Sequence, residues 1–296
     1  MIEIRAIDKT IYASQLAAFL PAQIIDIHTH AWLRAFVRDD FHDPRLAKWP
    51  ERVAADNSIE DLLASYRLLL PGKKVTPMVF GWPERSVDLA QTNAYIGRVC
   101  REHGLPGLLV SDPAWSAAQV EELVSTHGLR GLKPYLSLAP LALKTEEVTV
   151  YDFLPEAHLE VANAHGWIIM LHVPRPGRLK DPVNLQHLLE IERRYPRARV
   201  IVAHIGRAYC APDVGNAFEV LAETERLLFD FSANTNSHVM ADLLRAVGPR
   251  RVLFGSDLPA TRMRMRRICE GGNYINLVPE GLYGDISDDP HMREVH

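Results

Sequence analysis

The stretch IIDIHTH, residues 24–30, decides how the rest of the chain is interpreted. Two isoleucines lead into Asp26, His28 and His30, which stand at every second position, and the apolar run then ends. Because successive side chains of a β-strand point to opposite faces, these three residues share one face. The stretch therefore predicts a buried strand that carries ionisable side chains to its C-terminal end.

Seven further apolar or β-branched runs predict strands of the same kind. All eight are expected at residues 23–30, 73–80, 105–112, 129–136, 166–173, 199–206, 226–232 and 250–257. Between them, apolar residues recur every three or four positions, which is the spacing of helices. These helical segments are 59–70, 86–104, 116–128, 151–166 and 182–196. Gly104, Gly128 and Gly166 end three of them, as is typical of helix C-termini.

Strands that alternate with helices indicate an α/β protein with a parallel sheet, and eight of them predict a single-domain (β/α)8 TIM barrel. A doubly wound open sheet is the alternative, and the lack of a Gly-rich phosphate loop after the first strand disfavours it. We expect an N-terminal extension at 1–22, the barrel at 23–270 and an irregular C-terminal segment at 271–296 that packs on the barrel. The long insertion 31–58 would lie over the active face.

Composition narrows the class of protein. The chain has 296 residues, is 47% hydrophobic and carries a net charge of −4, which favours neither nucleic acid nor an anionic membrane as a partner. Cys100, Cys210 and Cys269 are few and odd in number, so we expect reduced thiols in a cytoplasmic protein. The N-terminus shows no signal-peptide pattern, and no apolar run is long enough to cross a bilayer. A homo-oligomer is left open.

Ionisable residues close four of the predicted strands at their C-terminal ends, where barrel enzymes carry their chemistry. They are His28, His30, His172, His204 and Asp257. Burying so many titratable groups is costly, and a divalent metal ion removes the cost because imidazole and carboxylate are its natural ligands. A catalytic ion also keeps a position open for water, whose pKa it lowers towards 7.

Each of these signals is weak when taken alone. With thirteen histidines, one HxH pair arises easily by chance, and a single histidine at a strand end is more often a hydrogen-bonded structural residue. Asp257 could cap the following helix. The coincidence of all of them at strand ends favours a metal site.

The motifs resemble those of the amidohydrolase superfamily: IDIHTH on the first predicted strand, LHV on the fifth, AHIG on the sixth and LFGSDLP on the eighth. They are most similar to the amidohydrolase-related group, which includes aminocarboxymuconate semialdehyde decarboxylase and related hydrolases, decarboxylases and lactonases. The resemblance covers about residues 23–260. It implies a (β/α)8 fold with one metal ion, usually zinc, with manganese as the alternative.

The same resemblance implies roles for individual residues. His28, His30, His172 and Asp257 would be the metal ligands, and His204 would polarise the substrate or stabilise developing charge. In hydrolytic members the aspartate also accepts a proton from the metal-bound water, which would give Asp257 two roles.

Lys133, in the sequence GLKPY, stands at the end of the fourth predicted strand. In binuclear members of the superfamily a lysine on this strand is carbamylated and bridges two metals, and a second metal would recruit His204. The alternative is an unmodified cation that pairs with a substrate carboxylate or with Asp257. We favour the unmodified lysine, because the group that the chain resembles is usually mononuclear.

Residues after the strand ends suggest what the site binds. Arg175 and Arg207 favour a small carboxylate-bearing substrate, because arginine matches carboxylates with two hydrogen bonds. Trp32 and Tyr135 would line an apolar pocket wall. A solvated rim and ordinary loop packing are the alternatives. The basic run RMRMRR, residues 262–267, is interpreted as a helix face.

Three functions remain after this reasoning. The leading one is a metal-dependent hydrolase, in which activated water attacks the carbonyl of an amide, lactone or ester. The second is a non-oxidative decarboxylase of an aromatic or muconate-type acid with the same metal site. The third is a non-catalytic barrel that binds a ligand.

Overall fold

Eight parallel strands alternate with helices in the computed structural model, which describes residues 3–38, 41 and 43–296. The strands are β1 Gln23–His30, β2 Lys74–Phe80, β3 Leu109–Val110, β4 Gly131–Lys133, β5 Ile168–Leu171, β6 Arg199–Val202, β7 Leu228–Asp230 and β8 Val252–Leu253. Each lies inside a run that the sequence predicted as a strand, so all eight predictions are confirmed.

The strands pair in sequence order. β1 pairs with β2, and β3 to β8 form a six-stranded parallel sheet. Backbone hydrogen bonds also join the two sheets: Val79 N–H donates to Pro106 O at 3.0 Å, and Asp257 N–H donates to His28 O at 2.8 Å. These bonds place β2 beside the chain before β3, and β1 beside the chain after β8. The arrangement is a mostly parallel α/β sheet, consistent with a TIM barrel.

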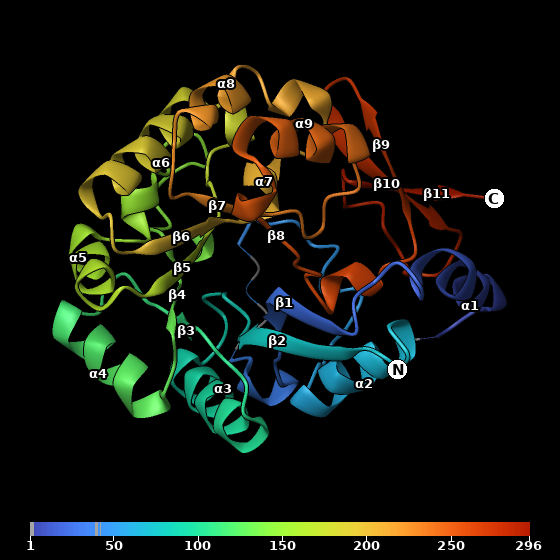
Figure 1. Ribbon diagram of the computed structural model, residues 1–296, viewed down its shortest axis with the longest axis horizontal. Helices are drawn as coiled ribbons and strands as arrows, with labels where there is room; N and C mark the ends of the chain where they lie inside the picture. Colours follow the sequence, from blue (N-terminus) through green and yellow to red (C-terminus); the bar gives the residue numbers. More distant parts are fainter. Residues whose placement is uncertain (1–2, 39–40, 42) are drawn as a thin grey trace.

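Helices surround the strands (Figure 1). They are α1 Ala6–Ile11, α2 Ile59–Leu69, α3 Leu89–His103, α4 Ala117–His127, α5 Glu156–His165, α6 Pro182–Arg194, α7 His204–Arg207, α8 Ala217–Ala222 and α9 Ser237–Val247. Short turns of other helix types are η1 Tyr12–Leu16, η2 Arg34–Phe36, η3 Leu136–Leu138, η4 Val150–Asp152, η5 Arg178–Lys180, η6 Ala211–Asp213, η7 Pro249–Arg251 and η8 Ala260–Arg262. As predicted, Gly104, Gly128 and Gly166 end α3, α4 and α5, each with a φ of 66° that suits glycine.

Apolar side chains from the strands form a small cluster directly under the ionisable residues. Its members are Ile27, Met78, Phe80, Leu108, Met170, Ile201 and Ala203. The ring of Phe80 is fully buried and lies edge-on to the imidazoles of His28 and His30, with ring centres 5.2 and 4.6 Å apart. Burial of such a side chain contributes about 1.5–3 kcal/mol. The imidazoles of His28 and His30 therefore pack against a buried apolar ring of this cluster.

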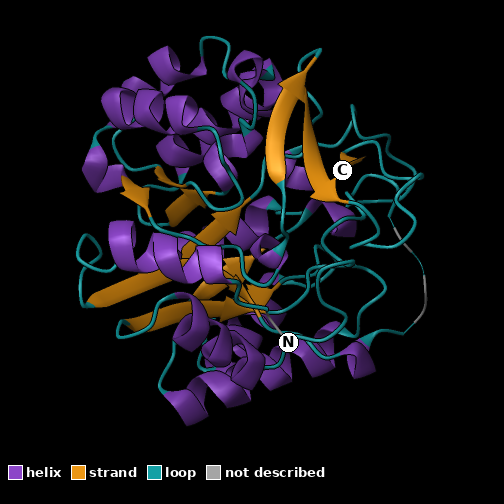
Figure 2. Cartoon of the chain, turned by 90° about the vertical axis from the view of Figure 1, so that its right-hand side faces the viewer, coloured by secondary structure: helices purple, strands orange, loops and turns teal. Residues whose placement is uncertain are grey.

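The C-terminal segment is not irregular, contrary to the prediction for 271–296. β9 Arg266–Glu270, β10 Asn273–Pro279 and β11 Met292–Val295 form a separate sheet in which β9 and β10 are antiparallel (Figure 2). Gly271 and Gly272 join them with positive φ angles of 55° and 81°, which is the backbone of a tight hairpin turn. The helix predicted over 262–267 is also wrong, because that run leads into β9.

Two of the three cysteines form a disulfide, so the prediction of reduced thiols is wrong for them. Cys210 and Cys269 are 59 residues apart in sequence and have their Cα atoms 5.9 Å apart, whereas Cys100 is a buried free thiol. The disulfide links the chain after β6 to β9. Spacing in sequence gave no sign of this pairing, because β9 was not predicted. It also removes the argument from cysteines for a reducing compartment.

The C-terminal sheet holds the first long loop in place. Trp49 of that loop packs in an apolar cluster with Met263, Val278 and Met292, and Lys48 and Arg52 both form ion pairs with Asp288. Residues 39, 40 and 42 of the predicted insertion lie outside the described residues.

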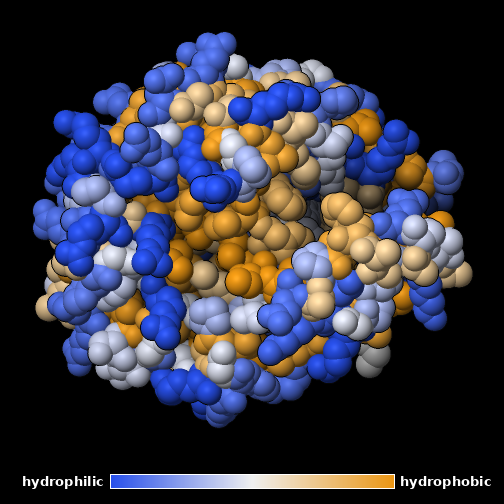
Figure 3. All heavy atoms as spheres, viewed as in Figure 1, coloured by the Kyte–Doolittle hydropathy of each residue, from blue (hydrophilic) through white to orange (hydrophobic). Residues whose placement is uncertain are grey.

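Among the described helices, none has the length and apolar character needed to span a membrane. On the face in Figure 3, apolar side chains gather over the centre and hydrophilic ones surround them.

Candidate active site

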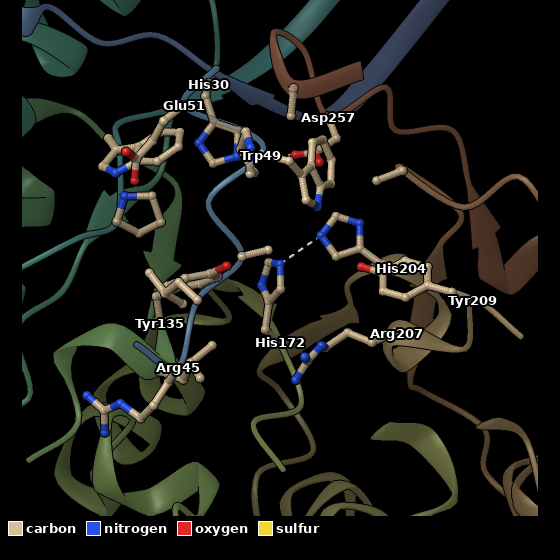
Figure 4. Close-up of a pocket in the computed structure, with 18 of the residues that line it drawn as sticks. His30, Arg45, Trp49, Glu51, Tyr135, His172, His204, Arg207, Tyr209 and Asp257 are labelled. Carbon is tan, nitrogen blue, oxygen red and sulfur yellow. Dashed lines mark hydrogen bonds and ion pairs between the residues drawn. The ribbon is translucent and has the colours of Figure 1, made fainter. Parts of the chain in front are cut away.

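The structure brings together the five ionisable residues that the sequence placed at strand ends. His28 and His30 end β1, and His172, His204 and Asp257 follow β5, β6 and β8 closely. All five are buried. Candidate ligand atoms of His28, His30 and Asp257 lie within 4.8 Å of one another, and so do those of His28, His172 and His204. The side chains surround one end of a cavity, with His172 facing His204 (Figure 4).

His28 and His30 point their Nε2 atoms at Asp257. The distances from these nitrogens to Asp257 Oδ1 are 3.5 and 3.3 Å. Oxygen atoms contact the other ring nitrogens: His28 Nδ1 lies 2.9 Å from Asp230 Oδ2, and His30 Nδ1 lies 3.1 Å from Gly81 O. Because a carboxylate and a carbonyl only accept hydrogen bonds, each Nδ1 carries the proton and each Nε2 presents a lone pair to the centre.

This geometry passes a test for a metal ion. His28 Nε2 is buried and has no hydrogen-bond partner among the described residues. A buried polar atom without a partner is rare in proteins and needs an explanation. Two lone pairs from imidazoles and one carboxylate oxygen form the donor set of a divalent ion. The donors present therefore fit such an ion.

His172 belongs to a second chain of contacts. Its Nδ1 lies 3.0 Å from Lys133 Nζ, and its Nε2 lies 2.8 Å from His204 Nε2. A charged lysine only donates, so it would place the His172 proton on Nε2 and direct it at His204. A neutral lysine can instead accept from Nδ1 and leave Nε2 free to bind a metal. Burial lowers the pKa of Lys133 to about 7, so both proton arrangements are accessible near neutrality.

Asp230 and Ser232 complete the site, and sequence analysis missed both. Ser232 Oγ lies 2.5 Å from Asp230 Oδ1, 2.9 Å from His204 Nδ1 and 3.2 Å from His28 Nδ1. The backbone N–H of His204 also donates to Asp230, at 3.0 Å. The signal was available, because Asp230 closes the seventh predicted strand as Asp257 closes the eighth. The two residues connect His28 to His204 behind the site.

Burial and charge set the protonation of the site. Burial is the largest cause that lowers the pKa of His28, His30 and His172, and it lowers the pKa of His204 to about 4. Burial alone would raise the pKa of Asp257, but its contact with His30 and the charge that the nearby imidazoles carry when protonated lower it to about 2. At neutral pH the site therefore combines neutral imidazoles with an ionised carboxylate, the protonation states that metal binding requires.

The chain after β6 makes a left-handed turn that orients two functional candidates. Residues 204–207 have φ angles of 57°, 54°, 58° and 63°. A left-handed conformation costs about 1–2 kcal/mol for each residue with a Cβ atom, and such strained residues cluster at functional sites. His204 begins the turn, where its N–H reaches Asp230, and Arg207 ends it at the cavity wall.

The cavity, counted together with the open space at its mouth, encloses about 950 Å³. Of the five residues predicted to bind substrate, Trp32, Tyr135 and Arg207 line it. Arg175 does not, because its guanidinium bonds to Asp181 at 3.2 Å. Lys133 does not either, because it is fully buried behind His172 and lies over the rings of Phe80 and Tyr135. The alternative in which Lys133 pairs with a substrate carboxylate is therefore not supported.

Arg207 lines the cavity and has hydrogen-bond donors that its contacts with the described residues do not use. Its Nη1 donates to the carbonyls of Val173 and Pro174 at 3.3 and 3.0 Å, and within residues 43–296 its other nitrogens have no hydrogen-bond partner. Arg45 also lines the cavity, but its guanidinium is bonded to Asp43 and to three backbone carbonyls. Arg207 can bind an anion, whereas Arg45 fixes the first loop.

Further residues of the cavity wall come from the loops after the strands and from the C-terminal sheet. They are Trp49 and Glu51 of the first loop, Trp82 after β2, Tyr209 after the left-handed turn and Tyr274 of β10. Tyr209 and Tyr274 pack edge to face with ring centres 4.9 Å apart, next to the disulfide. The length of the loop 31–58 was a sequence signal for part of this wall.

Comparison with known proteins agrees with this geometry. The amidohydrolase family profile matches residues 25–267. L-fucono-1,5-lactonase of Burkholderia ambifaria is 24% identical over 265 residues, which cover 81% of each chain. A crystal structure of a protein described as a probable 2-pyrone-4,6-dicarboxylic acid hydrolase, from Acinetobacter baumannii with citric acid bound, has a TM-score of 0.57 and 16% identity, covering 80% of this chain and 85% of that one.

A second solved structure is 2,6-dihydroxybenzoate decarboxylase in complex with 2,6-dihydroxybenzoate. Its TM-score is 0.55 at 14% identity, and the match covers 81% of this chain and 89% of the other. At such identities the two structures show a shared fold only. The family match, by contrast, extends over most of the chain and includes all five ionisable residues of the site. The chain belongs to the amidohydrolase family.

Proposed function

We propose that this protein is a metal-dependent hydrolase that opens the lactone ring of a small, carboxylate-bearing substrate. The eight strands would close into a (β/α)8 barrel, and His28, His30, His172 and Asp257 would hold one divalent ion, zinc in preference to manganese. The observation that carries this proposal is the unpartnered Nε2 of His28, which is buried beside His30 Nε2 and the Asp257 carboxylate.

When bound at such a site, a divalent ion provides a water nucleophile at neutral pH and polarises a carbonyl oxygen. One ion is favoured over two. Lys133 Nζ lies against Nδ1 of His172, on the side away from His204, so an unmodified lysine has a clear role as the partner of that imidazole. A carbamylated lysine bridging two ions is the less favoured alternative.

Three residues of the chain would carry out proton transfer and substrate binding. Asp257 is ionised and can accept the proton that the attacking water releases. The Nδ1–H of His204 is committed to the carbonyl of Ser232 at 2.8 Å, so its Nε2 faces the cavity and can take a proton and return it to the leaving oxygen. The free donors of Arg207 can hold the substrate carboxylate and fix its orientation.

Two facts favour a lactone over an amide or a simple ester. The curated relative that aligns over 81% of this chain is a lactonase, and the solved structure with a TM-score of 0.57 is described as a hydrolase of 2-pyrone-4,6-dicarboxylic acid, a cyclic ester with two carboxylates. Arg207 at the cavity wall is the kind of group that such a carboxylate needs. The same site could also cleave an amide or an ester, because both have a carbonyl that water can attack.

The test combines metal analysis with a lactone panel. We expect about one zinc or manganese ion per chain by mass spectrometry, and acid release from sugar lactones and carboxylate-bearing lactones that stops on chelation and returns with metal. Asp257→Asn should abolish turnover. Asp242→Asn, at an exposed carboxylate on α9, is the matched control. A purified protein without metal that no added metal activates would refute the proposal.

The decarboxylase alternative has its own support. The fold is shared with 2,6-dihydroxybenzoate decarboxylase, and Arg207 beside His172 and His204 could hold a carboxylate close to the ion. Release of carbon dioxide from aromatic or muconate-type acids, without hydrolysis of any lactone, would favour this alternative. A non-catalytic barrel predicts ligand binding with neither reaction.

A further inference from the structure

A second compartment adjoins the active-site cavity. With its mouth it encloses about 930 Å³, and it shares Trp32, Glu51 and Trp82 with the first cavity. Its other described walls come from the first loop and from the chain after β2. They are Leu33, Arg34, Val37, Phe41, Ala54, Ala55, Glu84, Ser86 and Val87. No part of the proposed hydrolytic reaction uses this space.

Two tryptophans divide the compartment from the active site. The rings of Trp32 and Trp82 meet edge to face with centres 4.4 Å apart, and their centres lie 5.9 and 6.3 Å from the ring of His30. The compartment therefore begins one ring away from a proposed metal ligand. A group attached to the reacting centre of a substrate can therefore contact these rings, which line both spaces.

The tryptophan rings offer apolar surface to whatever lies beside them. Trp32 Nε1–H donates to Ala55 O at 3.3 Å, and Trp82 Nε1–H donates to the Glu84 carboxylate at 2.5 Å. Both indole donors are thus used within the protein, and the ring carbons remain as the contact surface. Leu33, Val37, Phe41 and Val87 continue this surface beyond the rings.

Apolar surface and free hydrogen-bond donors lie at opposite ends of the combined space. The tryptophan rings and the side chains of Leu33, Val37 and Val87 supply apolar surface in the second compartment, whose charged wall residues are of both signs. Arg207 lies on the opposite side of the site, beyond His172 and His204 (Figure 4). A substrate with one charged and one apolar end would therefore bind with its carboxylate at Arg207 and its apolar end past the tryptophans.

We propose that the second compartment binds an uncharged alkyl or aryl substituent of the substrate, with Trp32 and Trp82 as the surface over which it enters. This inference rests on the proposed lactonase function and adds the class of substituent. Selectivity among lactones would then come from this compartment, while the histidines and Asp257 act on the ring that all of them share.

The experiment compares two lactones that differ only in an apolar chain, δ-valerolactone and the pentyl-substituted δ-decalactone. With metal-loaded enzyme we expect kcat/KM to be at least tenfold higher for δ-decalactone. Ala55→Phe, which adds a ring at a residue of the compartment wall, should reduce this ratio to below threefold. Ala118→Phe makes the same substitution at an exposed position on α4 and should leave the ratio unchanged.

The outcomes separate the two proposals. Hydrolysis of both lactones with equal kcat/KM, or a ratio that Ala55→Phe does not change, would overturn the compartment while lactonase activity stands. If neither lactone is hydrolysed, calorimetry with 4-pentylphenol tests the compartment without turnover, while the panel of carboxylate-bearing lactones decides the lactonase proposal. Binding that Ala55→Phe weakens at least tenfold and Ala118→Phe does not would support it, and absence of binding would overturn it.

Discussion

The carboxylate of Asp230 accepts the Nδ1–H of His28 at 2.9 Å, with both side chains fully buried. This contact fixes the tautomer of His28 and directs its Nε2 to the centre of the site. Burial alone would raise the pKa of Asp230, but the hydrogen bond that His28 donates, together with the attraction to His28 when it is protonated, outweighs burial and holds the pKa below its ordinary value. An anion behind a neutral imidazole makes that imidazole a stronger ligand.

Asp230→Asn should therefore weaken metal binding without removing a ligand. Such partners of metal-binding histidines typically contribute about 10–100-fold in affinity or activity, and we expect a loss in that range by competition with a chromophoric chelator. Asp213→Asn is the matched control, because Asp213 is also buried and paired, in its case with Arg178 at 2.6 Å. Equal metal affinity in the two variants would show that the contact is structural only.

Arg207→Ala should raise KM for carboxylate-bearing lactones far more than for uncharged ones. A hydrogen bond to a charged group contributes about 1.5–3 kcal/mol, which corresponds to roughly 10–150-fold in kcat/KM. Arg175→Ala removes an arginine from the next loop, where the guanidinium bonds to Asp181 outside the cavity, and should leave kcat/KM unchanged. Similar losses for charged and uncharged lactones would contradict the assignment.

Gly206→Ala tests the left-handed turn. Gly206 has a φ of 58°, and an added Cβ would come within 2.5 Å of Leu179 Cδ1. Gly104 at the end of α3 has a φ of 66° and nothing within 4 Å of such an atom. Both substitutions add backbone strain of about 1–2 kcal/mol, but Gly206→Ala also adds the clash. We expect only Gly206→Ala to lower kcat, because it displaces the segment that bears His204 and Arg207, and only Gly206→Ala to show an additional loss in the free energy of unfolding measured by urea denaturation.

Cys269→Ser should lower the free energy of unfolding by about 2–4 kcal/mol, because the disulfide closes a loop of this length in the unfolded chain. Cys269 is the cross-strand neighbour of Tyr274, and Cys210 follows Tyr209, so the variant should also raise KM through these two wall residues. Dithiothreitol should destabilise the wild type and have no further effect on Cys269→Ser. A wild-type protein that is insensitive to the reductant would count against the bond.

Acid should destabilise the metal-free protein through its buried histidines. The pKa of His204 is about 4 in the folded protein and 6.5 ordinarily, so between these values the unfolded chain binds more protons and stability falls as pH falls. By pH 5 the loss from His204 amounts to about 2 kcal/mol. Burial raises the pKa of Asp26 to about 6, and this carboxyl group offsets part of the loss because it binds a proton in the folded state first.

The variant His204→Asn isolates this contribution, since Asp26 and the other histidines titrate in both proteins. Urea denaturation at pH 7 and pH 5 should show a smaller loss of stability in the variant, by about 2 kcal/mol. An identical loss in the two proteins would mean that His204 does not stay neutral in the fold.

The strands and the five ionisable residues could be predicted because their signals are local. Short apolar and β-branched runs defined the strands, and period two showed which side chains share a face. A parallel sheet brings the C-terminal ends of its strands to the same edge. His172 and Asp257 were therefore expected together despite 85 positions between them. Asp230 obeyed the same rule and was missed only because a single aspartate at a strand end carries no motif.

Tertiary structure alone decided what surrounds those residues. The Cys210–Cys269 disulfide, the wall formed by Tyr209 and Tyr274 and the tryptophan pair all depend on distances between segments that no local pattern encodes. The same is true of Arg175 and Arg207, which look alike in sequence: one turns to Asp181 and the other, at the end of a left-handed turn, faces the cavity. Periodicity records which face a side chain occupies, whereas its partner is set by how distant parts of the chain pack.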